Sequence, residues 1–272
     1  MSTLTVGETF SLRRHTYRQR RSARRLVASG APWVFSRTAC LGNDTYNLLG
    51  LGLPRLNIQK GRGDFLAEAG ADNETPRIPW DVYAALRRRD VWPLLVEQEV
   101  DWWSASRPPE FVLMDSYSEL TDQEFVSVAT GARFFANFSD VDPKAMEDGS
   151  LASIGLIALE DLEGIIGRMF DAIHQVWPRV PVLFVHFPAD LERRPRFLER
   201  AAAIRTIVET RAGHDSLVTS LSLKTHTPSR PQGGSEPADF PYHYDQGTYM
   251  ELADRIRESM PRGLAAEAST KR

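Results

Sequence analysis

Short apolar runs recur along the chain, and each is bounded by polar residues, glycine or proline. Residues 33–36, 111–114 and 182–185 are such runs, rich in valine, leucine and phenylalanine. An apolar run of about four to eight residues without alternation is typical of a strand buried on both faces, as in a parallel sheet. These three segments, together with residues 216–223, are therefore predicted to be strands.

Longer segments with a helical period separate these strands. The clearest is residues 156–177, where apolar side chains recur every three or four positions and a proline follows. Residues 80–103 are predicted to form a helix that Pro93 kinks or divides. Glycine, acidic residues and proline are frequent over residues 61–79, which favours a surface loop. Further helices are predicted after residue 45, over residues 194–210 and over residues 249–258.

Strands that alternate with helices predict a doubly wound α/β domain. We expect three layers, α/β/α, with helices on both faces of a mostly parallel sheet, in one domain over residues 31–262. Residues 263–272 are expected to be a flexible tail. A chain of 272 residues is long enough to bury a large core, and no internal repeat is visible.

The amino-terminal segment differs from the rest of the chain in charge. Residues 1–30 contain seven arginines and one acidic residue, Glu8, a net charge of +6. The net charge of the whole chain is -3, so the remainder carries -9. The apolar stretch within residues 1–30 is too short for an export signal, so we do not expect export. The acidic remainder of the chain repels nucleic acid, so we do not expect nucleic-acid binding. We expect a basic helical arm whose arginines face acids of the domain, an anionic ligand or a partner.

Composition narrows the class of protein further. The apolar share of 42% and the charged share of 25% are ordinary for globular chains and exclude a coiled coil or a disordered tail protein. Cys40 is the single cysteine, so neither an intrachain disulfide nor a four-cysteine zinc site can form. No apolar run approaches the roughly 18 residues of a membrane span. We therefore expect a cytoplasmic protein. We also expect no metal and no cofactor, because no phosphate-binding glycine motif or metal-ligand spacing is present.

Candidate chemistry is sought where strands end, because ligands of doubly wound sheets bind at the carboxyl ends of the strands. Polar residues concentrate in three of the predicted loops, over residues 37–44, 115–119 and 225–245. The third loop contains His243 between two tyrosines, directly before the last predicted helix. A histidine in such a place acts as a general base when a carboxylate orients its ring.

Two of these loops resemble motif blocks of the SGNH/GDSL hydrolase superfamily. His243, followed by Gly247 and the final predicted helix, resembles the block that carries the catalytic histidine. Residues 38–44 resemble the block that carries the nucleophile. The resemblance implies an SGNH-type, flavodoxin-like fold and the hydrolysis or transfer of an acyl group.

The likeness is closer to a divergent bacterial branch of that superfamily, often associated with surface-polysaccharide genes. That branch has a cysteine with an aspartate four residues later, which falls here on Cys40 and Asp44. Its Asp-x-x-x-Glu pattern is similar to Asp115 and Glu119, and its Pro-Phe-His-Tyr signature is similar to residues 241–244. The three blocks, in this order, cover most of residues 33–257.

The chain departs from the family pattern at two positions. Where the family has its nucleophilic serine, this chain has Ala39, which offers no oxygen. Three explanations stay open: alanine replaces a serine to trap a ligand, Cys40 has taken over the attack, or the protein binds without cleaving. The superfamily's aspartate three residues before the histidine is also missing, so Asp239 is expected to orient His243, unless the site works as a dyad.

We therefore expect an SGNH-like esterase or O-acyltransferase that acts on an acylated carbohydrate or a related metabolite. Transfer to a sugar requires a donor such as acyl-CoA, for which the chain has no dedicated motif. The alternative is a catalytically inactive relative that binds a glycan or scaffolds a biosynthetic complex. The oligomeric state, a homo-oligomer included, stays open. The expected catalytic residues are Ala39 or Cys40, His243 and Asp239, with backbone amides near residues 40 and 41 as oxyanion donors; the expected substrate-binding residues are Asn43, Asp44, Asp115 and Tyr244.

Overall fold

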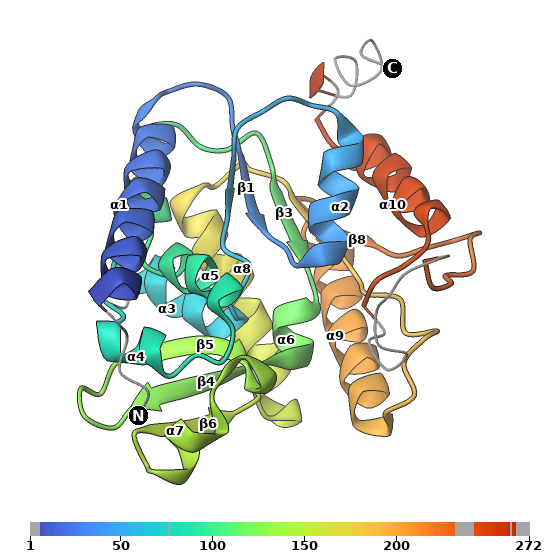
Figure 1. Ribbon diagram of the computed structural model, residues 1–272. Coiled ribbons are helices and arrows are strands. Elements are labelled where there is room, and N and C mark those ends of the chain that lie inside the picture. Colours follow the sequence, from blue (N-terminus) through green and yellow to red (C-terminus); the bar gives the residue numbers. More distant parts are fainter. Residues whose placement is uncertain (1–5, 76, 232–241, 262, 265–272) are drawn as a thin grey trace.

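Five parallel strands form the central sheet of the computed structural model, which describes residues 6–75, 77–231, 242–261, 263 and 264. The sheet order is β2-β1-β3-β7-β8, so the chain reverses its direction of winding between β1 and β3, as in a doubly wound fold. The predicted three-layer α/β class with a mostly parallel sheet is thereby confirmed (Figure 1). The strands are β1 (Val34–Arg37), β2 (Arg55–Asn57), β3 (Val112–Asp115), β7 (Val182–Val185) and β8 (Val218–Leu221).

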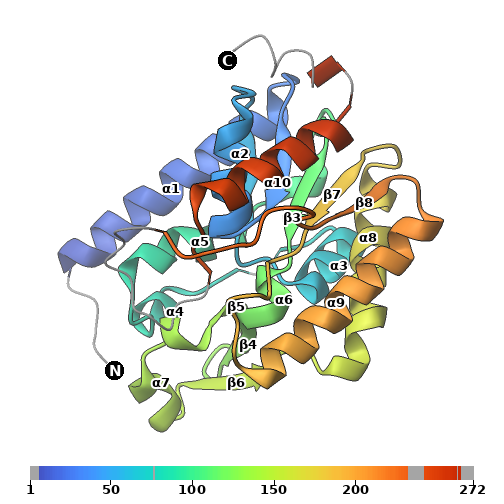
Figure 2. The same cartoon turned by 90° about the vertical axis from the view of Figure 1, so that its right-hand side faces the viewer.

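Helices cover both faces of this sheet, and they account for the continuous apolar runs in its strands. Every residue of β1, β3 and β7 is buried, whereas β8, at an edge, is buried only at its two ends. Figure 2 shows the two helical layers from the side. One layer holds α2 (Cys40–Leu49) and α10 (Gln246–Ser259), and the other holds α3 (Gly63–Asp72), α8 (Leu162–Val176) and α9 (Pro195–His214).

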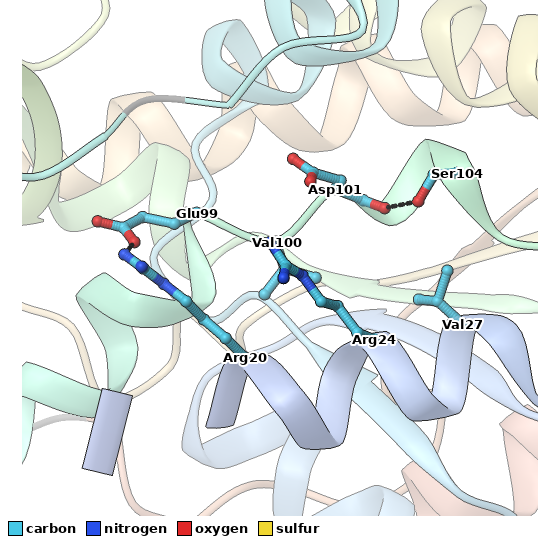
Figure 3. Close-up of a pocket in the computed structure, with 7 residues that line it drawn as sticks. All are labelled: Arg20, Arg24, Val27, Glu99, Val100, Asp101 and Ser104. Atoms are coloured by element: carbon cyan, nitrogen blue, oxygen red, sulfur yellow. Dashed lines mark hydrogen bonds and ion pairs between the residues drawn. The ribbon is translucent and has the colours of Figure 1, made fainter. Parts of the chain in front are cut away.

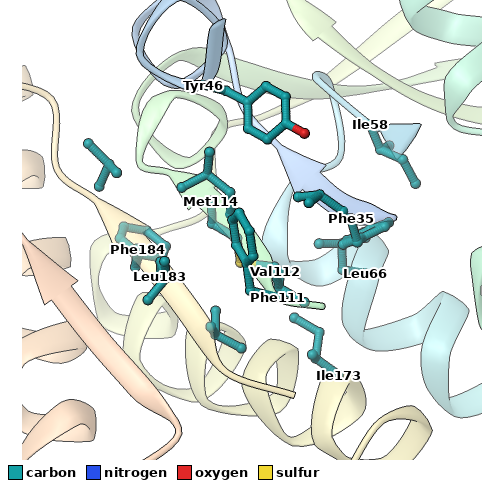
Figure 4. Packing of buried hydrophobic residues seen from close by; sticks show 14 of the residues in the cluster. Phe35, Tyr46, Ile58, Leu66, Phe111, Val112, Met114, Ile173, Leu183 and Phe184 are labelled. Atoms are coloured by element: carbon teal, nitrogen blue, oxygen red, sulfur yellow. The ribbon is translucent and has the colours of Figure 1, made fainter. Parts of the chain in front are cut away.

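The core lies between the sheet and these helices. Phe35, Val112 and Leu183 from three neighbouring strands are completely buried. Figure 4 shows them packed together with Leu66 of α3 and Ile173 of α8. Because both faces are closed in this way, only the ends of the strands remain for polar chemistry.

In chain order between β3 and α8, the protein forms a second, antiparallel sheet of three strands, which the sequence analysis did not predict. Its apolar pattern is interrupted because Asp122 and Glu124 are buried as ion pairs: Asp122 bonds to Lys60 at 3.0 Å, and Glu124 bonds to Arg133 at 2.5 Å. Buried charges in a strand hide it from an apolar pattern. The strands, in the order β5-β4-β6, are β4 (Asp122–Ser127), β5 (Arg133–Asn137) and β6 (Leu151–Gly155).

The prediction of a surface loop over residues 61–79 was wrong, because this segment contains α3. Its glycines allow close packing: a Cβ atom at Gly70 would lie only 2.9 Å from the Cβ of Ala172 on α8. Small residues that resemble loop composition therefore serve a helix–helix contact. Gly63 opens the helix, and its N–H donates to the carboxylate of Glu119 at 3.0 Å.

The helix predicted over residues 80–103, with a kink or division at Pro93, is divided into several short elements, and Pro93 kinks none of them. Pro93 stands in the first turn of a short helix, where the missing N–H costs nothing, so it starts a helix and does not kink one. The segment is divided into α4 (Trp80–Ala84), the 3-10 turn η1 (Arg89–Val91), α5 (Trp92–Glu97) and the 3-10 turn η2 (Trp102–Ser104). The remaining short elements are α6 (Tyr117–Thr121), η3 (Phe138–Asp140), α7 (Pro143–Glu147) and η4 (Leu159–Asp161).

The arginine-rich segment forms a long helix, α1 (Val6–Ala28), whose last turns pack on the domain. Ala23 and Val27 are buried, and the Val27 carbonyl accepts from the Ser106 N–H at 3.0 Å. Arg20 forms an ion pair with the buried carboxylate of Glu99 at a cavity of about 290 Å³ (Figure 3). None of the described helices combines the length and apolar character that crossing a membrane requires.

Candidate functional site

The carboxyl ends of β1 and β3 meet where the winding of the sheet reverses, which is the usual ligand site of a doubly wound fold. Residues 38–40 follow β1 and lead directly into α2, while Asp115 is the last residue of β3. The candidate residues of the first two loops are therefore brought together, as the positions of their strands predict.

Asp115 caps the amino terminus of α2. Its Oδ2 accepts from the N–H groups of Ala39 at 2.8 Å and Gly42 at 3.3 Å, and its Oδ1 accepts from the Tyr117 N–H at 3.1 Å. Burial raises the pKa of Asp115 to about 7, although Arg37 and these three N–H groups favour the charged form. Both oxygens of this predicted substrate-binding residue are thus engaged within the protein.

Arg37, which the sequence analysis did not single out, connects the two strand ends. Its guanidinium donates to the Asp115 carbonyl at 2.8 Å and to Glu119 Oε1 at 2.5 Å, and both side chains of this ion pair are buried. The two acidic residues of the Asp-x-x-x-Glu pattern, through their hydrogen bonds to Arg37 and to Gly63, therefore connect β1, β3 and the start of α3. An arginine that ends an apolar strand, combined with that pattern elsewhere, is the signal that could have identified the pair.

Asn57 fixes the turn between β1 and α2 from the neighbouring strand. Its Oδ1 accepts from the Thr38 N–H at 3.0 Å and from the Ser36 hydroxyl at 2.8 Å. Its Nδ2 donates to the Thr38 carbonyl at 3.0 Å. The sequence analysis missed Asn57 because β2 has only three residues and too few apolar positions to be recognised.

Positions 39 and 40 differ in accessibility. Ala39 is 1% exposed, so a hydroxyl at this position would be enclosed by protein. Cys40, the first residue of α2, is half-buried. Burial, followed by the charges of Asp44 and Asp115, raises the pKa of the Cys40 thiol. A thiol of this kind is protonated near neutral pH and requires a base before it can act as a nucleophile.

Asp44 and His243 are electrostatically linked beside the first turns of α2. Asp44 follows Cys40 by one helical turn, so the two side chains share a face of α2. Burial raises the pKa of Asp44, and the charges of His243 and Arg55 act in the opposite direction. His243 is half-buried and stands before α10. Its predicted partner Asp239 lies outside the described residues.

Asp245 anchors the loop that contains His243. It is the N-cap of α10, where its side chain accepts from the Thr248 N–H at 3.1 Å. It also accepts from the Ser229 N–H at 2.7 Å, and its Oδ1 lies 2.7 Å from Nε2 of His226. Although burial opposes the shift, these contacts hold the pKa of Asp245 well below its usual range. His226 therefore belongs to this anchor.

Tyr244 contributes to packing. It is 2% exposed, and its hydroxyl donates to the Pro188 carbonyl at 3.1 Å. Its ring lies 6.3 Å from that of Phe187 and 6.4 Å from that of Tyr249, centroid to centroid. This predicted substrate-binding residue therefore fixes the loop before α10 to the segment that follows β7.

Asn43 faces a different space from Asp44. Its Oδ1 accepts from the guanidinium of Arg55, and both residues line a cavity of about 400 Å³ between α1, α2, β2 and α5. On a helix, positions three and four residues after Cys40 lie on either side of it. Cys40 therefore stands between the cavity side and the His243 side of α2.

No protein-family model, curated protein or solved structure matches this chain significantly. Membership of the SGNH/GDSL superfamily therefore stays a prediction. Among the described residues, no group of three or more histidine, cysteine, aspartate or glutamate side chains is arranged to hold a metal ion.

Proposed function

We propose that this chain is a cytoplasmic esterase or O-acyltransferase that acts on an acylated carbohydrate or a related metabolite. The Cys40 thiol is the nucleophile, and the His243 imidazole is the general base. The observation that carries the proposal is the electrostatic link of Asp44 to both groups at the start of α2. The resemblance of three sequence segments to SGNH/GDSL hydrolases supports the same chemistry.

The first half of the reaction transfers the acyl group to the protein. His243 removes the thiol proton while the sulfur bonds to the acyl carbonyl carbon, which gives a tetrahedral oxyanion. The bond from this carbon to the leaving oxygen then breaks, and the imidazolium returns the proton to that oxygen. The products are a free alcohol and a thioester on Cys40.

The second half releases the acyl group from the thioester. His243 deprotonates water or an acceptor hydroxyl while its oxygen bonds to the thioester carbon. The carbon–sulfur bond then breaks and the imidazolium returns the proton to the Cys40 sulfur, which gives a carboxylic acid from water or a new ester from the acceptor. In the transferase reaction the acyl donor is a thioester such as acyl-CoA, so in the first half the bond that breaks is the one to the CoA sulfur, which takes the proton and leaves as free CoA. Asp44 stabilises the imidazolium that forms in both halves, as the carboxylate of a catalytic triad does. The amide of Cys40, at the positive end of α2, is the oxyanion donor in this scheme.

An inactive protein that binds a glycan, or scaffolds a biosynthetic complex through α1, is the second candidate. It is favoured by the use that Asp115 makes of the Ala39 and Gly42 amides. An oxyanion hole at a helix amino terminus requires unoccupied N–H groups, and Asp115 already holds two of them. In this alternative Cys40 is a small packing residue.

The experiment compares the unmodified protein with four variants, using 4-nitrophenyl acetate and acetylated monosaccharides as substrates. Cys40→Ala and His243→Asn are expected to lower kcat/KM by about 1000-fold or more, because each removes a group that reacts. His214→Asn makes the same chemical change at an exposed histidine at the end of α9 and is expected to keep full activity.

Two further outcomes would decide against the thiol mechanism. Activity that survives Cys40→Ala would exclude the thiol as the nucleophile, and activity that arises only in Ala39→Ser would assign the attack to position 39. Absence of activity with all substrates and with acetyl-CoA as donor, together with retained binding of a glycan, would establish the second candidate.

A further inference from the structure

A polar cavity of about 400 Å³ lies under α1, beside the carboxyl end of β2. Its size exceeds that of a monosaccharide, and it opens next to the turn that Asn57 fixes. The walls come from four elements distant in sequence. Six of its lining residues have an amide, guanidinium or carboxyl group: Gln19, Asn43, Arg55, Asn57, Gln59 and Glu97.

Arg55, a lining residue of this cavity, keeps one hydrogen-bond donor without a partner. Its guanidinium lies over the Tyr46 ring, 4.6 Å from the centroid, and its Nη2 donates to Asn43 Oδ1. Its Nη1 is buried and has no hydrogen-bond partner among the described residues. Leaving a buried charged donor unpaired costs free energy, which a ligand acceptor would recover.

Gln19 presents the complementary acceptor. Its Nε2 donates to the Pro93 carbonyl at 3.4 Å, which orients the side chain. Its Oε1 is buried, and no described residue donates to it. A ligand that satisfies both Arg55 and Gln19 must therefore carry an acceptor and a hydroxyl or amine donor.

Glu97 does not add a negative charge to the cavity near neutral pH. Burial raises its pKa to about 8, although the Gln59 N–H and the charge of Arg55 favour ionisation. The Gln59 N–H donates to Oε2 at 3.3 Å. A protonated carboxyl group is both a donor and an acceptor, so Arg55 supplies the only formal charge among the lining side chains named above.

The neighbouring cavity under α1 contains an arginine that has a carboxylate partner. There, Arg20 of the helix is already paired with the buried carboxylate of Glu99 (Figure 3). No described carboxylate lies within salt-bridge distance of Arg55, whose guanidinium donates instead to the neutral Asn43. A ligand carboxylate at Arg55 would supply the ion-pair partner that Glu99 supplies to Arg20.

We propose that this cavity binds a monocarboxylated polyol of monosaccharide size, such as a hexuronic acid. The ligand carboxylate accepts from Arg55 Nη1, and its hydroxyls bond to Gln19 Oε1 and to the amides that line the walls. The proposal goes beyond the proposed reaction, because binding needs neither the thiol of Cys40 nor the imidazole of His243.

Isothermal titration calorimetry of the full chain at about pH 7 tests this proposal, with D-glucuronate, D-glucose and inorganic phosphate as ligands. D-glucuronate is expected to bind at least about 10-fold more tightly than either of the others, since only it offers both a carboxylate and hydroxyls. Equal affinity for phosphate would reduce the site to an anion site, and equal affinity for glucose would remove the role of Arg55. Either result, or no binding of D-glucuronate, overturns the proposal.

Variants separate the cavity from the rest of the protein. Arg55→Gln is expected to weaken D-glucuronate binding by about 10-fold or more and to leave glucose binding unchanged, and Arg55→Lys is expected to restore part of the loss. Arg77→Gln makes the same change at an exposed arginine of another cavity and is expected to have no effect. Unchanged binding to Arg55→Gln would contradict the proposal.

The outcome for the cavity is independent of the outcome for the reaction. Cys40→Ala is expected to bind D-glucuronate as the unmodified chain does, because Cys40 does not line the cavity. An unmodified chain that binds D-glucuronate but has no esterase activity would refute only the reaction, and one that has the activity but does not bind D-glucuronate would refute only the cavity proposal. Thermal unfolding of each variant confirms that it is folded.

Discussion

Two carboxyl groups stand near the carboxyl ends of parallel strands and have different roles: Asp115 is buried at the end of β3, and Glu97 is half-buried beside β2. Burial raises the pKa of both, to about 7 for Asp115 and to about 8 for Glu97. Asp115 accepts three backbone hydrogen bonds, whereas Glu97 accepts one from the Gln59 N–H among the described residues. Similarly raised pKa values thus accompany very different degrees of internal hydrogen bonding.

This difference separates a structural carboxyl group from one that can recognise a ligand. Both carboxylate oxygens of Asp115 accept hydrogen bonds from backbone N–H groups, so the removal of this side chain should lower the stability of the fold. Glu97 lines a cavity and can still form hydrogen bonds with a ligand. Its removal should therefore mainly weaken ligand binding and change the pH dependence of stability. The following predictions test this contrast.

The largest effect is expected for Asp115→Ala. The change leaves three buried N–H groups without acceptors, and we expect the free energy of unfolding to fall by roughly 3 kcal/mol. Glu97→Ala removes one such acceptor and is expected to cost about 1 kcal/mol. Urea unfolding followed by circular dichroism measures both values. Equal losses for the two variants would break the contrast.

The two carboxyl groups should also differ in the pH range over which they affect stability. A carboxyl group with a raised pKa binds a proton in the folded state that the unfolded state has lost, so stability falls as pH rises from the unfolded to the folded pKa. The fall is up to about 1.4 kcal/mol per pH unit for each group. It ends at about pH 7 for Asp115 and at about pH 8 for Glu97.

Variants isolate these contributions. Glu97→Gln is expected to remove a slope that extends to about pH 8, and Asp115→Asn one that ends near pH 7. The comparison must be made against the unmodified chain, because burial lowers the pKa of His186 to about 3 and gives an opposite slope at acidic pH. Urea unfolding across this pH range measures the slopes, and identical slopes in both variants would contradict the assignment.

The smallest effect concerns the thiol that stands between the two regions. Because burial and two carboxylates raise the pKa of Cys40, its alkylation by iodoacetamide should be slow at neutral pH and should accelerate into the alkaline range. Asp44→Asn removes one of those carboxylates and is expected to raise the rate about 2- to 3-fold at a fixed pH. Asn47→Ala, at an exposed position of α2, serves as the control.

Mass spectrometry of the alkylated protein gives these rates. A rate that already reaches its maximum at neutral pH would identify a thiolate of low pKa and would contradict the need for His243 as a base.

The parallel sheet was predictable because its strands are buried on both faces and therefore read as uninterrupted apolar runs. The antiparallel sheet was not, because Asp122 and Glu124 are buried there through ion pairs with Lys60 and Arg133. The helix α3 was missed for a related reason: Gly70 and its small neighbours serve close packing against α8, which composition alone does not distinguish from a loop.

The candidate site was predictable in part. The loops that contain Cys40 and Asp115 follow predicted strands, and the doubly wound order brings those strand ends together. Asp115 was expected to bind substrate, but its partners are backbone N–H groups, which no side-chain pattern reveals. Tyr244 has a comparable explanation, since its hydroxyl is bonded to the backbone of Pro188.

The amino-acid sequence by itself determined the class of fold, since apolar period and strand–helix alternation depend on local order alone. It also determined that Cys40 is the single thiol and that arginines gather in the first 30 residues. Only the tertiary structure decided which buried groups are paired. Asp115 is bonded on both oxygens while Arg55 keeps an unpaired nitrogen, because hydrogen-bond partners far apart in sequence meet only when the chain is folded.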